Sequence, residues 1–591
     1  MSDRWAIAVC VAAVSGAFLA WGPSVAVAAV GVVAALALRR PLVLAAAVFL
    51  LTGGLAARAE AGLAPAPAGS FDGWVTALSD PESVGTGVRF DVRLADGRHL
   101  QVEAYDGRAR EELRSVKAGQ RFLVTGRTRP PPPGATWLMT RHIVGTLAVD
   151  DVRARSPGAA WMQAANNVRD LLVRGADGLS ERERPLFLGF VLGDTRGQPA
   201  DVTDDFRGAG LSHLLAVSGQ NVAFVLALAG SVLRRLGLRS RMPATIAVIA
   251  FFALVTRFEP SVLRASAMAA LAVTAATMGR EASSVRLLAL AVTGLVVVDP
   301  FLVRSVGFQL SAAACVGIVT LAPRIASALR VPRWLGEPLS VTLGAQAGVA
   351  PVLLTTFGGV PIAGIPANVL AAPLAGPVMI WGLSAGLVAG ALGSGCATVL
   401  HWPTHLMIGW IAGVAHWGAL VPLGEVRAGE LALIFGGAVV AAAAARIEFV
   451  GLRRAGVAVI ALALLTPAVL LRGTPPLQVA VASGATLWRD GGVVLELDGR
   501  ADAASLLEGL RRAGVTSIDV VVMTSSSLTV RDALDAVRRR YHVGRALVPS
   551  NTRVDVSLRV GSLRVDAHPV DGHLNVVVSV DDGGSARGPP V

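Results

Sequence analysis

Apolar segments close to the length of a membrane span recur along this chain of 591 residues. A helix needs about 20 mostly apolar residues to cross the hydrocarbon core of a bilayer. Hydrophobic residues make up 53% of the sequence and charged residues only 16%, against roughly 25% in soluble domains. The pattern predicts an integral membrane protein, and we expect the first apolar segment to be a membrane helix rather than a cleaved signal peptide.

The N-terminal quarter of the chain contains two different kinds of segment. Residues 1–57 hold about three apolar segments, which we expect to be transmembrane helices. Residues 58–158 mix charge with short alternating runs such as GVRFDVRLADGRHLQVEAY, separated by Asp-Gly and Ala-Gly turn signals. This alternation predicts a small β-barrel of about five strands.

The rest of the chain divides into three further parts. Residues 159–210 are polar enough to form interfacial linker helices. Residues 211–472 return to apolar segments, punctuated by proline, glycine and basic loops, and predict a helical membrane domain. Residues 473–591 show strand patterns (VVLELDG, DVVVMT) and a helix, and predict a second soluble domain.

Arginine placement predicts the topology. If the loop with Arg39 and Arg40 is cytoplasmic, the positive-inside rule places residues 58–158 outside the cytoplasm. Placing the later basic loops inside gives about thirteen crossings, provided that residues 361–376 are re-entrant. Both soluble domains are then expected on the extracytoplasmic side.

Net charge and rare residues exclude some classes of function. The formal charge of +12 fits an anionic partner such as nucleic acid or anionic lipid, but it also fits the positive-inside rule alone. The lone lysine, Lys117, lies in Ser-Val-Lys-Ala, so the chain has no Walker A motif. The three cysteines lie in apolar segments without a CxxC pattern, and we expect no cofactor or bound metal.

The segment GLSHLLAVSGQNVAF, residues 210–224, places polar side chains in an apolar run. Such side chains usually face a bundle interior or a water-filled path. The spacing of His213, Gln220 and Asn221 (i, i+7, i+8) predicts one helix face, and with Ser218 these residues are candidates for a polar path. The alternative is interhelical hydrogen bonding, with Ser218 and Gly219 as a close-packing or kink point.

Further candidates lie outside this segment. Arg264, in SVLRASAM, could hold a phosphate through its planar fork, or snorkel to the membrane interface. Gln309 and Ser311, in GFQLSAAAC, fit the polar path more weakly. In the linker, Asp194 and Arg207 are expected to form ion pairs or cap helices.

Three segments together resemble the ComEC-type competence proteins, the channels for DNA uptake in bacterial transformation. They are FLGFVLGDTRGQPADVTDDFRGAGLSHLLAVSGQNVAFVLAL, PSVLRASAMAALAVTAATMGREASSVRLLALAV and DPFLVRSVGFQLSAAACVGI. Many family members have Leu-His after the Ser-Gly pair, where this chain has Gln220 and Asn221. The resemblance implies that one DNA strand passes through a polytopic competence domain.

The expected fold is therefore a polytopic α-helical membrane protein with about 11–13 transmembrane or re-entrant helices. The resemblance implies an N-terminal OB-like β-barrel domain and a C-terminal metallo-β-lactamase-like α/β domain. It implies a place in the bacterial cytoplasmic membrane. The implied partners are single-stranded DNA, membrane lipid, a DNA receptor on the outer face and a cytoplasmic ATPase or helicase motor; homodimerisation is left open.

The metal site of the C-terminal domain is degenerate in this sequence. Family members often carry a Thr-His-x-His-x-Asp-His segment after an apolar strand. Here the strand IDVVVMT ends at Thr524, and the ligand positions correspond to Ser525, Ser527, Thr529 and Val530. None of these supplies an imidazole or a carboxylate, so we expect a truncated, non-enzymatic remnant.

The β domain offers candidates for contact with single-stranded DNA. Trp74 and Tyr105 could stack on bases, with Arg108, Arg121 and Arg127 near the phosphate backbone. Aromatic residues of a small barrel more often belong to its core.

Three functions remain open at this point. The first is a channel for single-stranded DNA. The second is a secondary transporter of a small solute with a midplane site, although no paired intramembrane carboxylates are present to couple protons or sodium. The third is a non-transporting membrane scaffold, which the lost metal ligands would suit.

Overall fold

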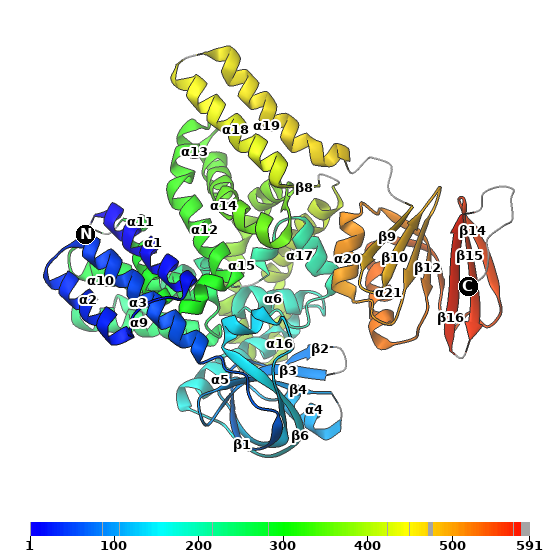
Figure 1. Cartoon of the computed structure of the whole chain (residues 1–591), viewed down its shortest axis with the longest axis horizontal. Helices are drawn as coiled ribbons and strands as arrows, with labels where there is room; N and C mark the ends of the chain where they lie inside the picture. The colour runs from blue at the N-terminus through cyan, green and yellow to red at the C-terminus, as the bar shows by residue number, and fades with distance from the viewer. Residues whose placement is uncertain are drawn as a thin grey trace. The chain divides into compact units, whose positions relative to one another are not determined.

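The computed structural model describes residues 2–84, 87–105, 107–215, 217–281, 283–421, 424–447, 449–470, 477–570 and 572–580 (Figure 1). The chain forms two compact units. One comprises Met1–Gly197, His213–Phe357 and Asn368–Ile411, and the other comprises Gln198–Ser212, Gly358–Ala367 and Ala412–Val591. The second unit therefore joins a short segment ahead of residue 213 to the C-terminal domain.

Three apolar helices open the first unit: α1 (Asp3–Leu19), α2 (Val25–Ala37) and α3 (Pro41–Ala61). α3 begins at a proline, whose fixed φ suits the first turn of a helix and whose missing N–H is not needed there. Gly16 lets α1 approach α3 closely, because a Cβ at this position would collide with the carbonyl oxygen of Phe49. The expected N-terminal apolar helices are present.

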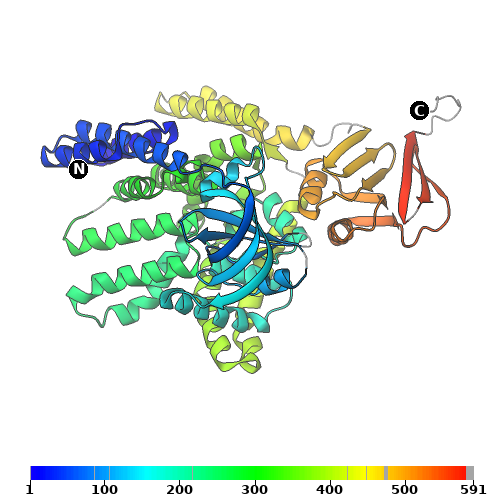
Figure 2. The same cartoon turned by 60° about the horizontal axis from the view of Figure 1, so that its bottom comes forward.

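The β domain consists of β1 (Gly69–Ala77), β2 (Glu82–Val84), β3 (Gly87–Leu94), β4 (His99–Ala104), α4 (Gly107–Arg114), β5 (Arg121–Arg129), η1 (Thr136–Arg141) and β6 (Ile143–Ser156). The sheet order is β1-β5-β6-β4-β3-β2, and β1 also pairs with β3. Only the β4–β6 pair is parallel. The strands curve around a core that includes Phe90, Leu100, Phe122, Val124 and Leu147 (Figure 2). The alternating runs of the sequence therefore form strands, as predicted.

The linker forms helices. They are α5 (Ala160–Gly175), η2 (Ala176–Gly178), α6 (Glu183–Leu192) and α7 (Ala200–Gly208). α5 is amphipathic, with Ala165, Arg169 and Leu172 on its buried side.

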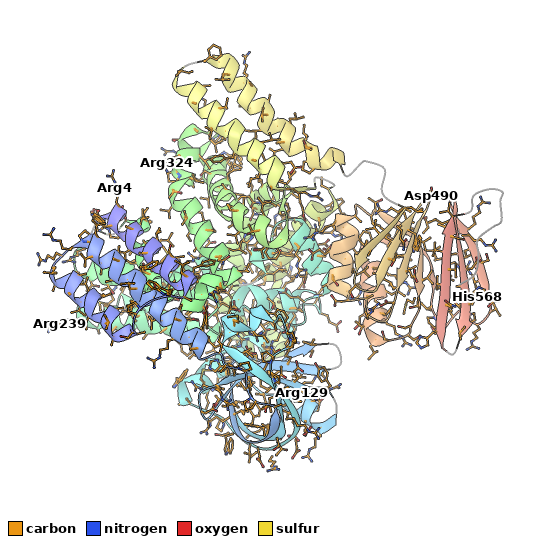
Figure 3. All side chains as sticks on the ribbon, in the orientation of Figure 1. Arg4, Arg129, Arg239, Arg324, Asp490 and His568 are labelled. Carbon is orange, nitrogen blue, oxygen red and sulfur yellow. The ribbon has the colours of Figure 1, made fainter. Side chains whose placement is uncertain are left out.

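The apolar segments that follow form most of the remaining helices. The elements are η3 (Ser212–Leu214), α8 (Gln220–Leu233), α9 (Leu238–Val255), α10 (Pro260–Thr277), α11 (Ser284–Val298), η4 (Pro300–Arg304), α12 (Val306–Thr320), α13 (Ala322–Ala328), α14 (Arg333–Phe357), β7 (Val360–Pro361), α15 (Gly364–Leu392), α16 (Ser394–Leu400), α17 (Trp402–Leu420), β8 (Glu425–Val426), α18 (Ala428–Arg446) and α19 (Val450–Leu470). Arginines of the basic segments lie near helix ends: Arg239 is in the first turn of α9 and Arg324 in that of α13 (Figure 3).

Among the described residues, four helices are long and apolar enough to cross a membrane: α3, α14, α15 and Val450–Pro467 of α19. α12 and α13, which are bent by 41° at a short break, make a fifth if the pair is one span. α2, α8, α11 and Ala428–Ala441 of α18 are shorter apolar helices. At 1.5 Å per residue, α2, α8 and α11 do not reach across a hydrocarbon core of about 30 Å. The chain is thus a mostly helical membrane protein whose described residues hold fewer full-length candidate spans than expected, and the total of 11–13 transmembrane or re-entrant helices stays a prediction.

The expectation of a re-entrant segment at residues 361–376 is wrong. From Gly364 onward these residues form the first part of α15, a continuous helix of 29 residues that runs through Pro373 and Pro377. Proline is tolerated inside membrane helices because neighbouring helices and local adjustments satisfy the freed backbone groups. Proline and glycine in the sequence therefore suggested a break that the helix does not make.

The C-terminal domain has two sheets. Its elements are β9 (Gln478–Ala482), β10 (Ala485–Arg489), β11 (Val493–Leu497), α20 (Ala503–Arg512), β12 (Ser517–Met523), α21 (Leu528–Arg540), β13 (His542–Leu547), β14 (Val556–Val560), β15 (Leu563–Val570) and β16 (His573–Val580). The first sheet has the order β13-β12-β11-β10-β9 and the second β14-β15-β16. α20 and α21 pack on one face of the first sheet, and β14 to β16 pack on the other (Figure 1). The expected boundary between residues 472 and 473 lies outside the described residues.

Candidate functional site

The polar motif forms a turn rather than the expected continuous helix. The 3-10 turn η3 ends at Leu214, and α8 begins only at Gln220. His213 lies exposed on η3, so it does not share a helix face with Gln220 and Asn221. Serine and glycine are poor helix formers, and the Ser-Gly pair lies where the helix is interrupted. The prediction of one polar helix face from the i, i+7, i+8 spacing is therefore wrong.

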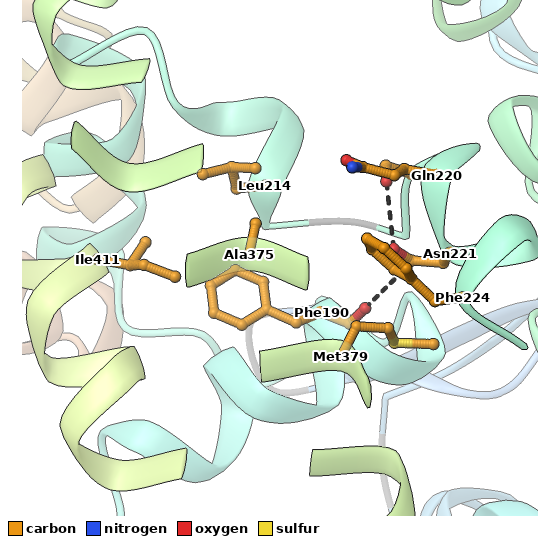
Figure 4. Close-up of a pocket in the computed structure, with 9 residues that line it drawn as sticks. Phe190, Leu214, Gln220, Asn221, Phe224, Ala375, Met379 and Ile411 are labelled. Atoms are coloured by element: carbon orange, nitrogen blue, oxygen red, sulfur yellow. Dashed lines mark hydrogen bonds between the residues drawn. The ribbon is translucent and has the colours of Figure 1, made fainter. Parts of the chain in front are cut away.

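Two hydrogen bonds fix the start of α8. The Ser218 hydroxyl donates to Oδ1 of Asn221 (3.2 Å), and the Asn221 side-chain amide donates to the carbonyl oxygen of Phe190 in α6 (2.9 Å) (Figure 4). Asn221 is only 7% exposed. The alternative of interhelical hydrogen bonding is therefore observed for Asn221, which ties α8 to α6.

A small cavity lies beside this turn. Ser218, Gln220 and Asn221 line it together with apolar side chains that include Phe190, Phe224, Met379 and Ile411 (Figure 4). Its volume of about 30 Å³ has room for roughly two water molecules. The cavity brings together three of the four predicted residues of the motif but is far too small for a nucleotide.

Arg264 lies directly under the turn, in α10. A Cβ added to Gly219 would lie 2.9 Å from Nη2 of Arg264 and 3.0 Å from Cβ of Ala265, so Gly219 makes a close contact with α10. The Ser261 hydroxyl, one turn earlier in α10, donates to the carbonyl oxygen of Val217 (2.7 Å). The motif and α10 are thus held against each other by a hydrogen bond and a close glycine contact.

The guanidinium of Arg264 has neutral partners. Its Nε donates to the Ser311 hydroxyl of α12 (2.9 Å), and its Nη1 contacts the thiol of Cys315 and the thioether of Met268 (3.9 Å). The residue is 7% exposed. Within the described part of the chain, no carboxylate lies within ion-pair distance of Arg264. The structure therefore brings together Arg264 and Ser311, and it does not place Arg264 at a snorkelling position.

Gln309, the other candidate in α12, has a different partner. Its side-chain amide donates to the carbonyl oxygen of Val303 in η4 (2.7 Å). The bond holds the 3-10 turn against the first turn of α12, so this contact gives Gln309 a local structural role.

The candidates of the β domain lie on its surface. Trp74 is 37% exposed, and the guanidinium of Arg121 lies 5.5 Å from its ring centre. Tyr105 is 52% exposed and donates to Glu103 (3.3 Å). Arg108 pairs with Glu112 one helical turn away, and Arg127 is exposed on β5. These aromatic side chains therefore do not belong to the core.

Sequence reasoning missed a buried network of ion pairs between the β domain and the helices. Arg169 of α5 lies 3.1 Å from Asp194 and 3.2 Å from Asp80. Arg257 lies 2.9 Å from Asp80. Arg196 donates to Asp194 through Nε (2.7 Å). The expected pairing of Asp194 is confirmed, but its partner Arg169 and the β-domain carboxylate are distant in sequence and carry no local signal.

Charge in this network favours ionised carboxylates. Burial alone would raise the pKa of Asp80, but the positive charges of Arg169, Arg257 and Arg196 outweigh it and hold the pKa well below its usual range. Burial alone would also raise the pKa of Asp194. Hydrogen bonds from Arg196 and its positive charge outweigh this effect, so the pKa of Asp194 is lowered. The network also holds Arg257 in a left-handed conformation (φ 58°), which costs a non-glycine residue about 1–3 kcal/mol. It thereby fixes the turn that leads into α10.

The four residues of the C-terminal domain that the resemblance places at metal-ligand positions have structural roles here. Ser527 caps α21 by accepting a hydrogen bond from the backbone N–H of Val530 (3.4 Å). Val530 is fully buried in the core beneath α21. Thr529 lies in the first turn of α21, and the Ser525 hydroxyl is buried next to Gly499. These residues form a helix start and a core contact.

Residues 190–450 match the family described as Competence protein. "ComE operon protein 3" of Bacillus subtilis (strain 168) is 25% identical over 316 residues, which cover 51% of this chain and 40% of that protein. An "Uncharacterized protein" of Aquifex aeolicus (strain VF5) is 26% identical over 275 residues, covering 45% of this chain and 63% of that protein. "Uncharacterized protein YcaI" of Escherichia coli (strain K12) is 26% identical over 206 residues, covering 32% of this chain and 27% of that protein.

The chain thus spans less than two thirds of the length of each of these relatives. No solved structure matches it. The match at 190–450 includes α8, α10 and α12, which carry Asn221, Arg264 and Ser311. By this match and by the similarity to the Bacillus subtilis protein, residues 190–450 of the chain form a domain of the ComEC-type family of competence proteins.

Proposed function

We propose that this chain conducts single-stranded DNA across the bacterial cytoplasmic membrane during natural transformation. Family membership supports a role in competence. The observation that carries the channel proposal is the environment of Arg264, a buried cation whose partners are a hydroxyl, a thiol and a thioether.

The chemistry of DNA passage fits this environment. Each nucleotide of the strand carries one negative charge, which crosses hydrocarbon only through a wet or positively charged conduit. The planar fork of an arginine binds two phosphate oxygens at once. In this proposal a phosphate takes the place of the neutral partners of Arg264, while Ser218 and Gln220 offer uncharged hydrogen-bonding groups nearby.

The proposal requires a conformational change. The cavity lined by Ser218, Gln220 and Asn221 measures about 30 Å³, far less than a nucleotide needs. Helices around the turn must therefore separate before a strand can pass. Because the chain has no Walker A motif, we propose that a cytoplasmic ATPase or helicase supplies the force.

We also propose an OB-like barrel for the β domain. The pairings β1–β5, β5–β6, β6–β4, β4–β3 and β3–β1 form a ring of five strands, with α4 between β4 and β5, which supports this proposal. Trp74 and Tyr105 would stack on bases, with Arg108, Arg121 and Arg127 near the phosphates. The domain would receive the strand from a DNA receptor on the extracytoplasmic side.

For the C-terminal domain we propose a metallo-β-lactamase-like fold without enzymatic activity, on the same side of the membrane. The parallel strands β11, β12 and β13 with α20 and α21 support an α/β fold of this kind. Ser525, Ser527, Thr529 and Val530 occupy the ligand positions, and none of them is a usual zinc ligand.

DNA import into a deletion strain tests the proposal. The strain is complemented with the wild type, with Arg264→Ala, with Arg264→Lys, or with Arg280→Ala as a matched control. Arg280 is exposed just beyond α10. Entry of fluorescent DNA into the cytoplasm is compared at equal membrane levels of each variant.

We expect Arg264→Ala to lower import at least tenfold, because a charge-assisted hydrogen bond contributes about 1.5–3 kcal/mol. Arg264→Lys keeps the positive charge but lacks the planar fork of the guanidinium, so its DNA import should lie between that of the wild type and that of Arg264→Ala. DNA import by Arg280→Ala should be normal. Normal import by the deletion strain or by Arg264→Ala would refute the channel proposal.

A further inference from the structure

Two adjacent buried carboxylates lie in α7, the helix before the polar turn. Asp204 is 2% exposed and Asp205 is 8% exposed. Carboxylates are rarely this buried unless they are paired. Leu211, three residues beyond the end of α7, is fully buried and begins the segment that leads into the turn.

Both carboxylates pair with arginines of the C-terminal domain. Nε of Arg511, in α20, lies 3.1 Å from Asp204. Nε of Arg540, in α21, lies 3.0 Å from Asp205 and 4.0 Å from Asp204. The side chain of Arg540 is only 3% exposed, so both partners of this pair are removed from water.

Further contacts surround this pair of carboxylates. Nδ1 of His416 lies 2.8 Å from Asp205, and Arg511 also reaches Glu425 (3.3 Å). Arg207, at the end of α7, pairs with Glu508 of α20 (3.3 Å). Burial raises the pKa of Asp205, against the opposing charge of Arg540.

Apolar contacts add to the docking. Ala200, at the start of α7, packs against the core that α20 and α21 form with the first C-terminal sheet. A Cβ on Gly208 would lie 2.9 Å from both Ala419 and the side chain of Arg511. α7 therefore belongs to the same compact unit as the C-terminal domain, although it ends at Gly208 and α20 begins only at Ala503.

The docking arginines and the lost metal positions lie at different places in the domain. Arg511 and Arg540 occupy the last turns of α20 and α21, where a positive charge suits the helix dipole. Ser527 caps the opposite end of α21. The 13 residues of this helix span about 20 Å at 1.5 Å per residue. Loss of the metal ligands thus leaves the docking contacts intact.

We infer that the C-terminal domain is a clamp that holds α7, the helix that precedes the polar turn in the sequence, by means of Arg511 and Arg540. These arginines are positioning residues. The clamp follows from the contacts alone, whereas its effect on DNA import rests on the proposed function. A domain without the usual metal ligands would thereby have a structural role, which is to hold α7 in place.

Hydrogen–deuterium exchange of the full chain in lipid nanodiscs tests the clamp directly. The variants are Arg540→Ala, the charge swap Asp205→Arg with Arg540→Asp, and Arg539→Ala. Arg539 is the matched control, because it precedes Arg540 in α21 and is exposed. We expect peptides from residues 198–212 to exchange at least tenfold faster in Arg540→Ala than in the wild type. Their exchange rate should be unchanged in Arg539→Ala and should return part of the way to the wild-type rate in the charge swap.

DNA import by the same variants separates the clamp from the channel. At equal membrane levels, import should fall at least fivefold in Arg540→Ala and recover partly in the charge swap. If Arg540→Ala does not accumulate, Arg511→Gln replaces it. Unchanged exchange at residues 198–212 would overturn the clamp whatever the import. Faster exchange there, together with normal import by the deletion strain, would uphold the clamp and refute the proposed function.

Discussion

Arg169 and Arg264 are both 7% exposed, yet their partners differ in charge. Arg169 lies between Asp80 and Asp194, and its charge is matched. Arg264 lies against Ser311, Cys315 and Met268, which carry no charge to match it. The two arginines are equally buried but are stabilised in different ways.

The difference separates a structural arginine from a candidate binding arginine. A matched buried pair holds elements together, and removal of one partner leaves an uncompensated charge. A buried cation with neutral partners keeps its capacity to attract an anion, and inside a membrane protein such a residue marks a functional site by default. The first three predictions below concern Arg169 or Arg264 and their surroundings.

The largest effect is expected from Arg169→Ala. It leaves Asp194 and Asp80 with fewer positive partners inside the protein, and breaking a buried pair costs about 3–5 kcal/mol. Thermal unfolding of the detergent-purified chain measures the loss. Arg153→Ala is the control, because its pair with Asp72 is about half exposed and should contribute no more than about 1 kcal/mol. Equal melting temperatures for the two variants would contradict the structural role of Arg169.

Ser311→Asp should give Arg264 a carboxylate partner, so that its charge is matched as the charge of Arg169 is. A carboxylate at the position of the Ser311 hydroxyl would occupy the fork that we propose for phosphate. We expect DNA import to fall about tenfold, which corresponds to about 1.4 kcal/mol of lost binding, without loss of membrane level. Ser311→Ala should change import much less. Import by Ser311→Asp at the wild-type rate would argue against phosphate contact at Arg264.

A smaller effect is expected from acid. The pKa values of Asp80 and Asp194 are lowered in the folded chain. Their contribution to stability is therefore fully present above the ordinary carboxyl value of 3.8 and is lost as the pH falls below it toward the lowered value. Melting temperatures between pH 7 and pH 3 should fall less steeply in Asp80→Asn than in the wild type. Parallel curves would show that Asp80 is not a source of the acid sensitivity.

The smallest effect is expected from Arg121, an exposed arginine over the ring of Trp74. Arg121→Ala should change stability by no more than about 1 kcal/mol, as is usual for exposed cation–π contacts. Affinity of the full chain for a fluorescent single-stranded oligonucleotide should fall a few-fold, and further in Trp74→Ala, since base stacking contributes about 1–3 kcal/mol. Unchanged affinity in both variants would remove this surface from the proposed DNA path.

Local patterns in the sequence predicted the secondary structure of the β domain and the pairing of Asp194. They also selected Arg264 and Ser311 as members of one site, and the structure places these side chains 2.9 Å apart. The same patterns failed at residues 213–221 and 361–376. In both segments, glycine, serine or proline changes the backbone in a way that depends on the helices packed against it.

The sequence by itself determined the membrane class, the alternating strands and the absence of a Walker A motif, because each depends on residue type and local spacing. Tertiary structure alone decided which buried charges are matched. Asp80 meets Arg169 and Arg257, and Asp204 meets Arg511, across separations in sequence that no periodic pattern spans. The energy of a buried charge depends on what lies within a few ångströms of it, and only the folded chain sets those neighbours.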